Sequence, residues 1–345
     1  MNTDMNRNDI LNKLIIHPSF NSTVEDLNKK SIRVPKKAVI QELDYYNYVY
    51  PPNGKLLTVI DEIEKISLDP KVGQELANGD RPIMAYDESI NRFSSLEGDA
   101  FLASHSLVIN ADEGYVPSNK ITLYFYTRSK NICEGTQYIK HSVNPQSDSK
   151  KDFVLDKINF MKDCTVSNSI LLIDGPLIGG DWYIHMIQAI NEFLEKDVIP
   201  IFFVKNSNSN LVTDEIVEFK NRFNSDMHWS FNYLKPGERT NFFRYVDRGN
   251  EKNAKIFCYL KPFNVSPQRV EFHVDTFNKY RKKIPELMDL IYYLILVQGN
   301  ARDPQVRPIA IAEAYARETI KLFNLQSLMK DVGIIPTINQ ERFAW

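Results

Sequence analysis

The sequence predicts an α/β fold in which helices flank a mixed sheet. Three observations support this class. Apolar, strand-like runs follow one another between residues 82 and 127, and a helix–strand–helix–strand alternation then occupies residues 148–204. In addition, the apolar runs 83–86 and 170–173 each end on an aspartate. Successive strands followed by alternating helices and strands are typical of a sheet with helices packed on its faces.

The N-terminal region, residues 1–78, is expected to be mainly helical, with Leu56–Leu68 as its most periodic segment. The pattern becomes strand-like from Arg81 onward, where apolar runs of strand length begin. We therefore expect an N-terminal helical region over residues 1–78 and a main domain with C-terminal helices over residues 79–345.

Within the main domain, strands and helices are predicted from hydrophobic periodicity and from turn residues. The predicted strands are 82–86, 100–110, 120–127, 170–174, 198–204, 241–246, 254–260 and 269–274. The predicted helices are 148–164, 181–196 (with Asp181 as its cap), 211–223 and two long helices after Pro285, separated by 299–307. This order fits a ribonuclease H-like arrangement, which places acidic residues on neighbouring strand tips.

The composition is that of an ordinary globular protein, with 43% hydrophobic and 25% charged residues. No apolar run reaches the ~18 residues that a membrane helix needs, so no membrane partner is expected. The polar segment 1–12 lacks the apolar stretch of a signal peptide. Three scattered cysteines give neither a zinc spacing nor a disulfide framework, which favours a reducing, cytoplasmic location.

The net charge of −2 argues against nonspecific coating of DNA, which usually needs a basic domain. The charge is nevertheless uneven, because residues 235–302 hold 13 Lys and Arg against 7 Asp and Glu. Such a local basic surface could hold phosphates, although uneven charge is also common on solvated faces. Neither a P-loop nor a G-x-G-x-x-G motif is present, which argues against ATP hydrolysis by this chain.

Asp87 and Asp174 are the leading candidates for chemistry because each follows a buried-strand candidate. An ionised carboxylate in such a place is costly unless it is neutralised, and one divalent cation shared by both would neutralise them. Hard oxygen ligands suit Mn²⁺ or Mg²⁺, and the absence of Cys and His clusters disfavours zinc. The alternative is that these aspartates simply end strands and start turns.

A third acid is needed to bind two metal ions. The candidate is Asp156 on the predicted helix before the Asp174 strand, and Asp152 lies one turn earlier on the same face. Further alternatives, local in sequence, are Glu88, Glu97 and Asp99. Each of these acids could equally be a solvated surface residue.

Several cations could contact a nucleic acid. Lys205 closes the predicted strand 198–204 and could contact the scissile phosphate or stabilise the leaving oxygen. Tyr259, Lys261 and Arg269 fall on a probable strand pair and could form a surface that tracks the phosphate backbone and stacks a base. The alternative for Lys205 is a charge that only caps the strand end. The alternative for the other three residues is an exposed strand face without a binding role.

Six motifs, taken in order over about residues 80–320, resemble the NurA nuclease family. In that family a V-D-G-S-like strand end and a helix with an acid are followed by an L-L-D-G-S-L-like strand. A V-x-K strand end, a Y-L-[KR]…R segment and a helix beginning Y-P-x-P-L-x-x-A-H come next. The corresponding stretches here are MAYDES, DFVLDKINF, ILLIDGPL, IFFVKNS, YLKPFNVSPQR and VRPIAIAEAY.

The resemblance implies a ribonuclease H-like nuclease that depends on Mn²⁺ or Mg²⁺. It further implies a homodimer that processes DNA ends together with a hexameric HerA-type ATPase, with antiphage defence as a possible context. By motif, Asp87, Asp174 and Asp156 would be metal ligands, and Lys205 and Tyr259 would be supporting residues.

Three departures from the family motifs stand out. Glu88 replaces the usual Gly, and the helix acid is an Asp rather than a Glu. Tyr315 is taken as the counterpart of the motif's His. These departures leave open a catalytically inactive subunit that docks onto a HerA-type ATPase. A hydrolase of small phosphorylated metabolites is a third possibility, for which the sequence offers no phosphate-binding Gly-rich loop.

Overall fold

A computed structural model describes residues 55–59, 64–111, 114–134, 139–216, 219 and 221–337. The chain divides into two compact units, residues 1–36 and 37–345. The predicted N-terminal helices up to residue 54 lie outside the described residues. The predicted boundary after residue 78 falls inside the second unit.

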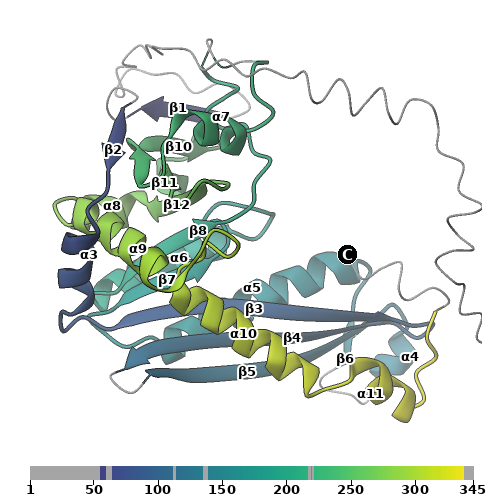
Figure 1. Cartoon of the computed structure of the whole chain (residues 1–345). Helices are drawn as coiled ribbons and strands as arrows, with labels where there is room; N and C mark the ends of the chain where they lie inside the picture. Colours follow the sequence, from purple (N-terminus) through teal and green to yellow (C-terminus); the bar gives the residue numbers. More distant parts are fainter. Residues whose placement is uncertain are drawn as a thin grey trace, which may run out of the picture. The chain divides into compact units, whose positions relative to one another are not determined.

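The described strands join one mixed sheet, in the order β1-β10-β11-β12-β8-β7-β3-β4-β5-β6, with β9 beside β11 and β2 beside β9 (Figure 1). Strands β3, β4 and β5 form an antiparallel meander, and β7 and β8 continue the sheet parallel to β3. Their spatial order β5-β4-β3-β7-β8 is that of a ribonuclease H-like sheet, as the sequence predicts. The strands are β1 (Lys55–Val59), β2 (Lys65–Ser67), β3 (Ile83–Ser94), β4 (Asp99–Ala111), β5 (Gly114–Thr127), β6 (Ile139–His141), β7 (Ile170–Asp174), β8 (Ile199–Val204), β9 (Glu238–Thr240), β10 (Phe243–Asp247), β11 (Ala254–Lys261) and β12 (Gln268–His273).

Helices cover both faces of this sheet (Figure 1). Helices α5 and α6 pack on one face, where Met84, Leu171 and Phe202 lie in their core. Helices α9 and α10 pack on the other face, over Ala85, Leu172 and neighbouring residues. The helices are α3 (Pro70–Ala77), α4 (Lys130–Cys133), α5 (Pro145–Cys164), α6 (Ile184–Glu195), α7 (Asp226–Tyr233), α8 (Val274–Tyr280), α9 (Ile284–Gln298), α10 (Arg307–Lys321) and α11 (Leu325–Asp331), with a 3₁₀ turn η1 (Glu251–Asn253).

Strands β7 and β8 explain why the sheet is covered on both faces. In β7 the four residues 170–173 are buried, and all six residues of β8 are buried. Consecutive apolar residues of a strand point to opposite faces, so each face must be sealed by its own layer of helices.

The structure corrects three local predictions. The segment Leu56–Leu68, expected as a helix, contains β1 and β2, whose ladders with β10 and β9 outweigh the helical periodicity. The described residues of 211–223 form turns rather than a helix, and the helix of this region is α7. Helix α6 begins after Tyr183 without a side-chain cap, so Asp181 is not its N-cap.

Helix α10 approaches the sheet closely because its inward positions carry small side chains. Ala312 and Ala316 are fully buried, and Pro308, Ile309 and Ile320 complete the same face. The helix lies along β3 and β4 (Figure 1). The site described below includes a residue of α10, so this packing positions part of it.

The substitution Ala316→Leu should push α10 away from β3 and β4, because a fully buried alanine has no room for three further carbons. We expect the free energy of unfolding to fall by about 1–3 kcal/mol, measured by urea denaturation. The matched control is Ala314→Leu on the same helix, where the side chain is only half-buried. Equal stability of the two variants would contradict close packing at residue 316.

Candidate functional site

Asp87 and Asp174 lie side by side on adjacent parallel strands. The last paired residues of β3 and β7 are Tyr86 and Ile173, and the two aspartates follow directly. Ala85 and Leu172, two residues earlier, face the α9–α10 side, so strand alternation puts both carboxylates on that side. Asp174 ends its strand as predicted, whereas β3 continues to Ser94 and Asp87 is not at a strand tip.

Asp87 is a buried and incompletely satisfied carboxyl group, with an exposed fraction of 5%. Its Oδ1 accepts a hydrogen bond from the Glu88 backbone N–H at 2.7 Å. Its Oδ2 is buried and has no hydrogen-bond partner among the described residues. Burial, and next the neighbouring Asp174 carboxylate, raise the pKa of Asp87 to about 8. An additional cation would relieve both causes.

Lys205 directly follows β8, and its ammonium group contacts the Asp174 carboxylate. Its Nζ lies 2.7 Å from Asp174 Oδ2 and 3.5 Å from Glu313 Oε2. It also donates a hydrogen bond of 2.7 Å to Gln305 Oε1. Burial opposes the charge of the ammonium, but the surrounding carboxylates, Asp174 first, outweigh burial and raise its pKa. The lysine therefore stays charged between two carboxylates.

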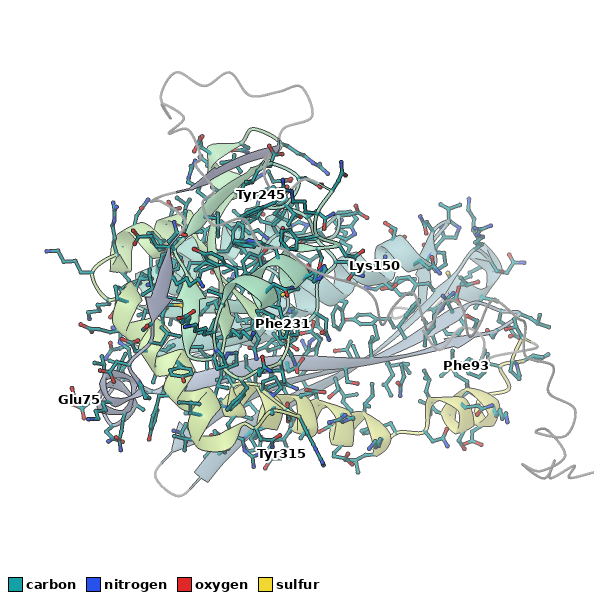
Figure 2. The ribbon with its side chains drawn as sticks, turned by 45° about the horizontal axis from the view of Figure 1, so that its top comes forward. Glu75, Phe93, Lys150, Phe231, Tyr245 and Tyr315 are labelled. Carbon is teal, nitrogen blue, oxygen red and sulfur yellow. The ribbon has the colours of Figure 1, made fainter. Side chains whose placement is uncertain are left out.

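Glu313 on α10 is the site residue that the sequence analysis missed. Besides Lys205, its carboxylate accepts a hydrogen bond from Gln305 Nε2 at 3.3 Å and lies 3.8 Å from Arg317. The motif P-L-x-x-A-H contained the signal, because its His is five residues after the proline. Counting from Pro308 gives Glu313 rather than Tyr315, which is 38% exposed on α10 (Figure 2).

Asp156 does not join this site, which corrects the predicted ligand set. It accepts hydrogen bonds from Lys120, from Thr122 Oγ1 at 2.6 Å and from Tyr124 at 2.8 Å on β5. These residues lie on the α5 face of the sheet, opposite the face that carries Asp87. Burial opposes its ionisation, but His105, whose Nε2 lies 3.5 Å away, and the hydrogen bonds from these neighbours hold the pKa of Asp156 well below its usual value.

The other candidate acids also have their own partners. Asp152 accepts hydrogen bonds from Tyr126 at 2.5 Å and Lys140 at 2.6 Å. Glu88 pairs with Lys157 at 3.0 Å, also on the α5 face. Glu97 accepts from the Ile335 backbone N–H at 3.0 Å, and Asp99 pairs with Arg92 at 2.8 Å. None of these contacts involves Asp87 or Asp174.

The sequence predicts an exposed nucleic-acid surface at Tyr259, Lys261 and Arg269, but all three residues are buried. Their exposed fractions are 0%, 4% and 4%. Tyr259 donates to Asp226 Oδ2 at 2.8 Å, and Lys261 donates to the Phe231 carbonyl at 2.8 Å. A stacking platform needs an exposed ring, so this prediction is wrong for the described conformation.

The donor set around Asp87 fits a hard divalent cation. Asp87 and Asp174 supply carboxylate oxygens, Glu313 lies beside Lys205, and Asp87 Oδ2 is an orphaned buried acceptor that a cation would satisfy. Within the described ranges, however, no three or more His, Cys, Asp or Glu side chains lie close enough together to hold a metal ion. Lys205 supplies the positive charge in the described arrangement.

No helix in the described part of the chain is long and apolar enough to cross a membrane. No curated protein sequence matches the chain. Several solved structures resemble it at low sequence identity, among them two NurA structures and one endonuclease V structure. The NurA nuclease from Sulfolobus solfataricus is 11% identical, with 79% of this chain and 88% of that chain covered and a TM-score of 0.46.

A NurA structure with manganese is 9% identical, with coverage of 75% and 93% and a TM-score of 0.32. Endonuclease V from Bacillus subtilis is 9% identical, with coverage of 70% and 81% and a TM-score of 0.36.

The comparison that carries the assignment is with a protein family. Residues 165–318 match the NurA domain. The matched range includes Asp174, Lys205 and Glu313, and it leaves out Asp87 and Asp156. This match confirms the resemblance to the NurA family over residues 165–318, which contain four of the six motifs.

Proposed function

We propose that this protein is a DNA nuclease that depends on Mn²⁺ or Mg²⁺ and whose site is built on Asp87 and Asp174. The observation that carries the proposal is the pair itself: two neighbouring carboxylates, one with an orphaned buried oxygen, on adjacent strands of a ribonuclease H-like sheet. The NurA domain supports a nuclease-family role. Glu313 replaces Asp156 as the third acid in this proposal because it lies beside Lys205.

In this proposal the acidic residues bind the metal ion and the lysine contacts the phosphate. A bound divalent cation supplies activation of water and neutralisation of the phosphate. Asp87 and Asp174 would hold the cation, and Glu313 would complete or orient the site from α10. Lys205 would exchange its contact with Asp174 for a contact with a phosphate oxygen, since a cation at that point offsets developing negative charge.

The proposal includes a homodimer that works in the cytoplasm with a HerA-type hexameric ATPase, in DNA end processing or antiphage defence. The family resemblance supports this partnership. The net charge of −2 is consistent with it, because a ring-shaped motor that feeds DNA to the site would supply most of the grip.

A second candidate, a catalytically inactive docking subunit, is favoured by one specific observation. The Lys205 ammonium, 2.7 Å from Asp174 Oδ2, already neutralises one of the two carboxylates. If the ion pair persists, the site needs no metal. Calorimetric titration of the protein with Mn²⁺ separates the candidates, since the docking subunit would show no binding.

The substitution Asp174→Asn should reduce Mn²⁺-dependent cleavage of linear DNA by ~100-fold or more, because an amide is a neutral and weaker ligand. The contrasting variant is Asp156→Asn, which alters the opposite face of the sheet and should retain cleavage below its own melting temperature. Cleavage that survives in the first variant and disappears in the second would refute the assignment of the site.

The substitution Glu313→Gln should weaken Mn²⁺ binding ~10-fold, because it removes one carboxylate from the site. Isothermal titration calorimetry measures the change. The control is Glu318→Gln on the same helix, whose carboxylate pairs with Lys321 at the surface. Unchanged affinity in the Glu313 variant would exclude this residue from the metal site.

The raised pKa of Asp87 predicts a pH-dependent stability. The folded state binds the Asp87 proton up to a pH of about 8, whereas the unfolded state releases it near 3.8. Stability should therefore fall as the pH rises through this window. Relative to Asp87→Asn, the wild type should lose ~1 kcal/mol or more between pH 5 and pH 9 in EDTA, measured by urea denaturation. Parallel pH profiles would contradict the raised pKa.

A further inference from the structure

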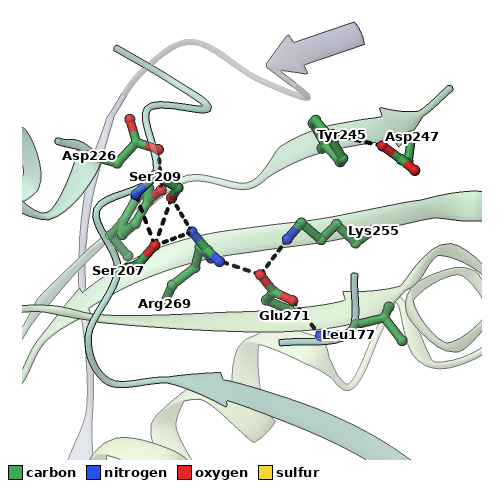
Figure 3. A network of polar contacts seen from close by, with 10 residues as sticks. Leu177, Ser207, Ser209, Asp226, Tyr245, Asp247, Lys255, Arg269 and Glu271 are labelled. Atoms are coloured by element: carbon green, nitrogen blue, oxygen red, sulfur yellow. Dashed lines mark hydrogen bonds and ion pairs between the residues drawn. The ribbon is translucent and has the colours of Figure 1, made fainter. Parts of the chain in front are cut away.

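Lys255, Arg269 and Glu271 form a buried charge cluster, which Figure 3 shows from close by. Glu271 on β12 is fully buried, and its Oε1 lies 2.6 Å from Lys255 Nζ and 2.7 Å from Arg269 Nε. Both cations are also buried, with exposed fractions of 2% and 4%. Burying three charges is costly and is weak evidence for a stabilising role. The cluster therefore calls for an explanation other than stability.

The second oxygen of Glu271 ties the cluster to the loop after Asp174. Glu271 Oε2 accepts a hydrogen bond of 2.8 Å from the backbone N–H of Leu177, three residues beyond Asp174. Between them, Gly175 has a positive φ of 101° and donates its N–H to the Phe203 carbonyl at 2.8 Å. The turn that leaves Asp174 is thus held at Gly175 by β8 and at Leu177 by Glu271.

Arg269 ties the same cluster to the loop after Lys205. Its Nη1 donates to Ser209 Oγ at 2.6 Å, and Ser207 Oγ donates to Ser209 Oγ at 2.9 Å. The Asp226 backbone N–H donates to the Ser209 carbonyl at 3.0 Å, and Tyr259 donates to the Asp226 carboxylate. The contacts therefore lead from Arg269 through Ser209 to Asp226 (Figure 3).

We infer that Glu271 and Arg269 are positioning residues, which fix the Asp174 and Lys205 loops relative to each other from the opposite face of the sheet. Arg269 and Glu271 alternate with Val270 and Phe272, which face the α9 side. Glu271 therefore acts through the Leu177 backbone and Arg269 through the Ser207 and Ser209 side chains, and neither contacts the Asp87 or Asp174 carboxylate. The expected effect on catalysis rests on the proposed function, whereas the effect on loop order does not.

Glu271→Gln tests the inference because a glutamine can satisfy only one side of the contact. If its carbonyl oxygen faces Lys255 and Arg269, its NH₂ group meets the Leu177 N–H, donor against donor. The reverse orientation sets the NH₂ group against both cations. The variant also leaves two buried positive charges, so it should be destabilised as well.

A second variant separates positioning from stability. Lys255→Met combined with Glu271→Gln restores the net charge of the cluster to its original +1 and removes a buried ion pair, which is often nearly neutral for stability. In this double variant Arg269 still needs the glutamine oxygen, so Leu177 remains without an acceptor. The melting temperature should recover, and the order of the Leu177 loop should not.

Hydrogen–deuterium exchange resolved at Leu177 and steady-state DNA cleavage are the two measurements. In both variants we expect the Leu177 amide to exchange ~10-fold faster than global unfolding accounts for. We also expect kcat to fall ~10-fold or more with KM within about twofold of wild type, as for misplaced catalytic groups.

Two results would overturn the inference: unchanged protection of Leu177 in the Gln variants, or recovery of both stability and kcat in the double variant. If the wild type cleaves no DNA, the nuclease proposal fails separately. Exchange at Leu177 then decides the positioning role by itself, because it requires neither metal nor activity.

A matched pair of serine variants isolates the Lys205 side. Ser207→Ala with Ser209→Ala removes the Arg269 acceptors and leaves the Glu271 contacts intact. Exchange in residues 205–210 should rise and kcat should fall, with Leu177 still protected. The control is Ser95→Ala with Ser142→Ala, which removes two hydrogen-bonded hydroxyl groups elsewhere. Equal behaviour of the two pairs would refute the Arg269 link.

Discussion

The central constraint in this structure is the parallel pairing of β3 with β7, which sets Asp87 beside Asp174. Two carboxylates at adjacent strand positions repel each other, and burial raises the cost of their charge. Two features reduce this cost: the raised pKa of Asp87 favours its neutral form, and Lys205 pairs with Asp174 from the end of β8. A divalent cation could therefore replace the proton on Asp87 and the Lys205 ammonium beside Asp174.

The two faces of the sheet keep their polar groups separate. On the α5 face, Asp156 is held by Lys120, Thr122 and Tyr124, and its hydrogen-bonding capacity is largely used. On the α10 face, Asp87 retains an orphaned oxygen. A fully bonded carboxylate is a structural element, whereas an incompletely bonded one at comparable burial is a candidate for binding. This difference distinguishes Asp87 from Asp156.

The sequence predicts the central fold well because strand length, order and burial are local properties. The strands containing Asp87 and Asp174, and the helices α5, α6, α9 and α10, follow from periodicity. Which face a helical acid reaches is not local: Asp156 lies on α5 and Glu313 on α10, which cover opposite faces. Tyr259 and Arg269 were likewise expected at the surface, since alternation within a strand does not show that both faces are covered.

A crystal structure of the protein soaked in Mn²⁺, with anomalous data collected at the manganese absorption edge, would test whether Asp87 and Asp174 bind one ion. We predict an anomalous peak between the carboxylates of Asp87 and Asp174, with Lys205 displaced from Asp174. A peak at Asp156 on the α5 side, or a bare Asp87–Asp174 pair at millimolar Mn²⁺, would contradict it.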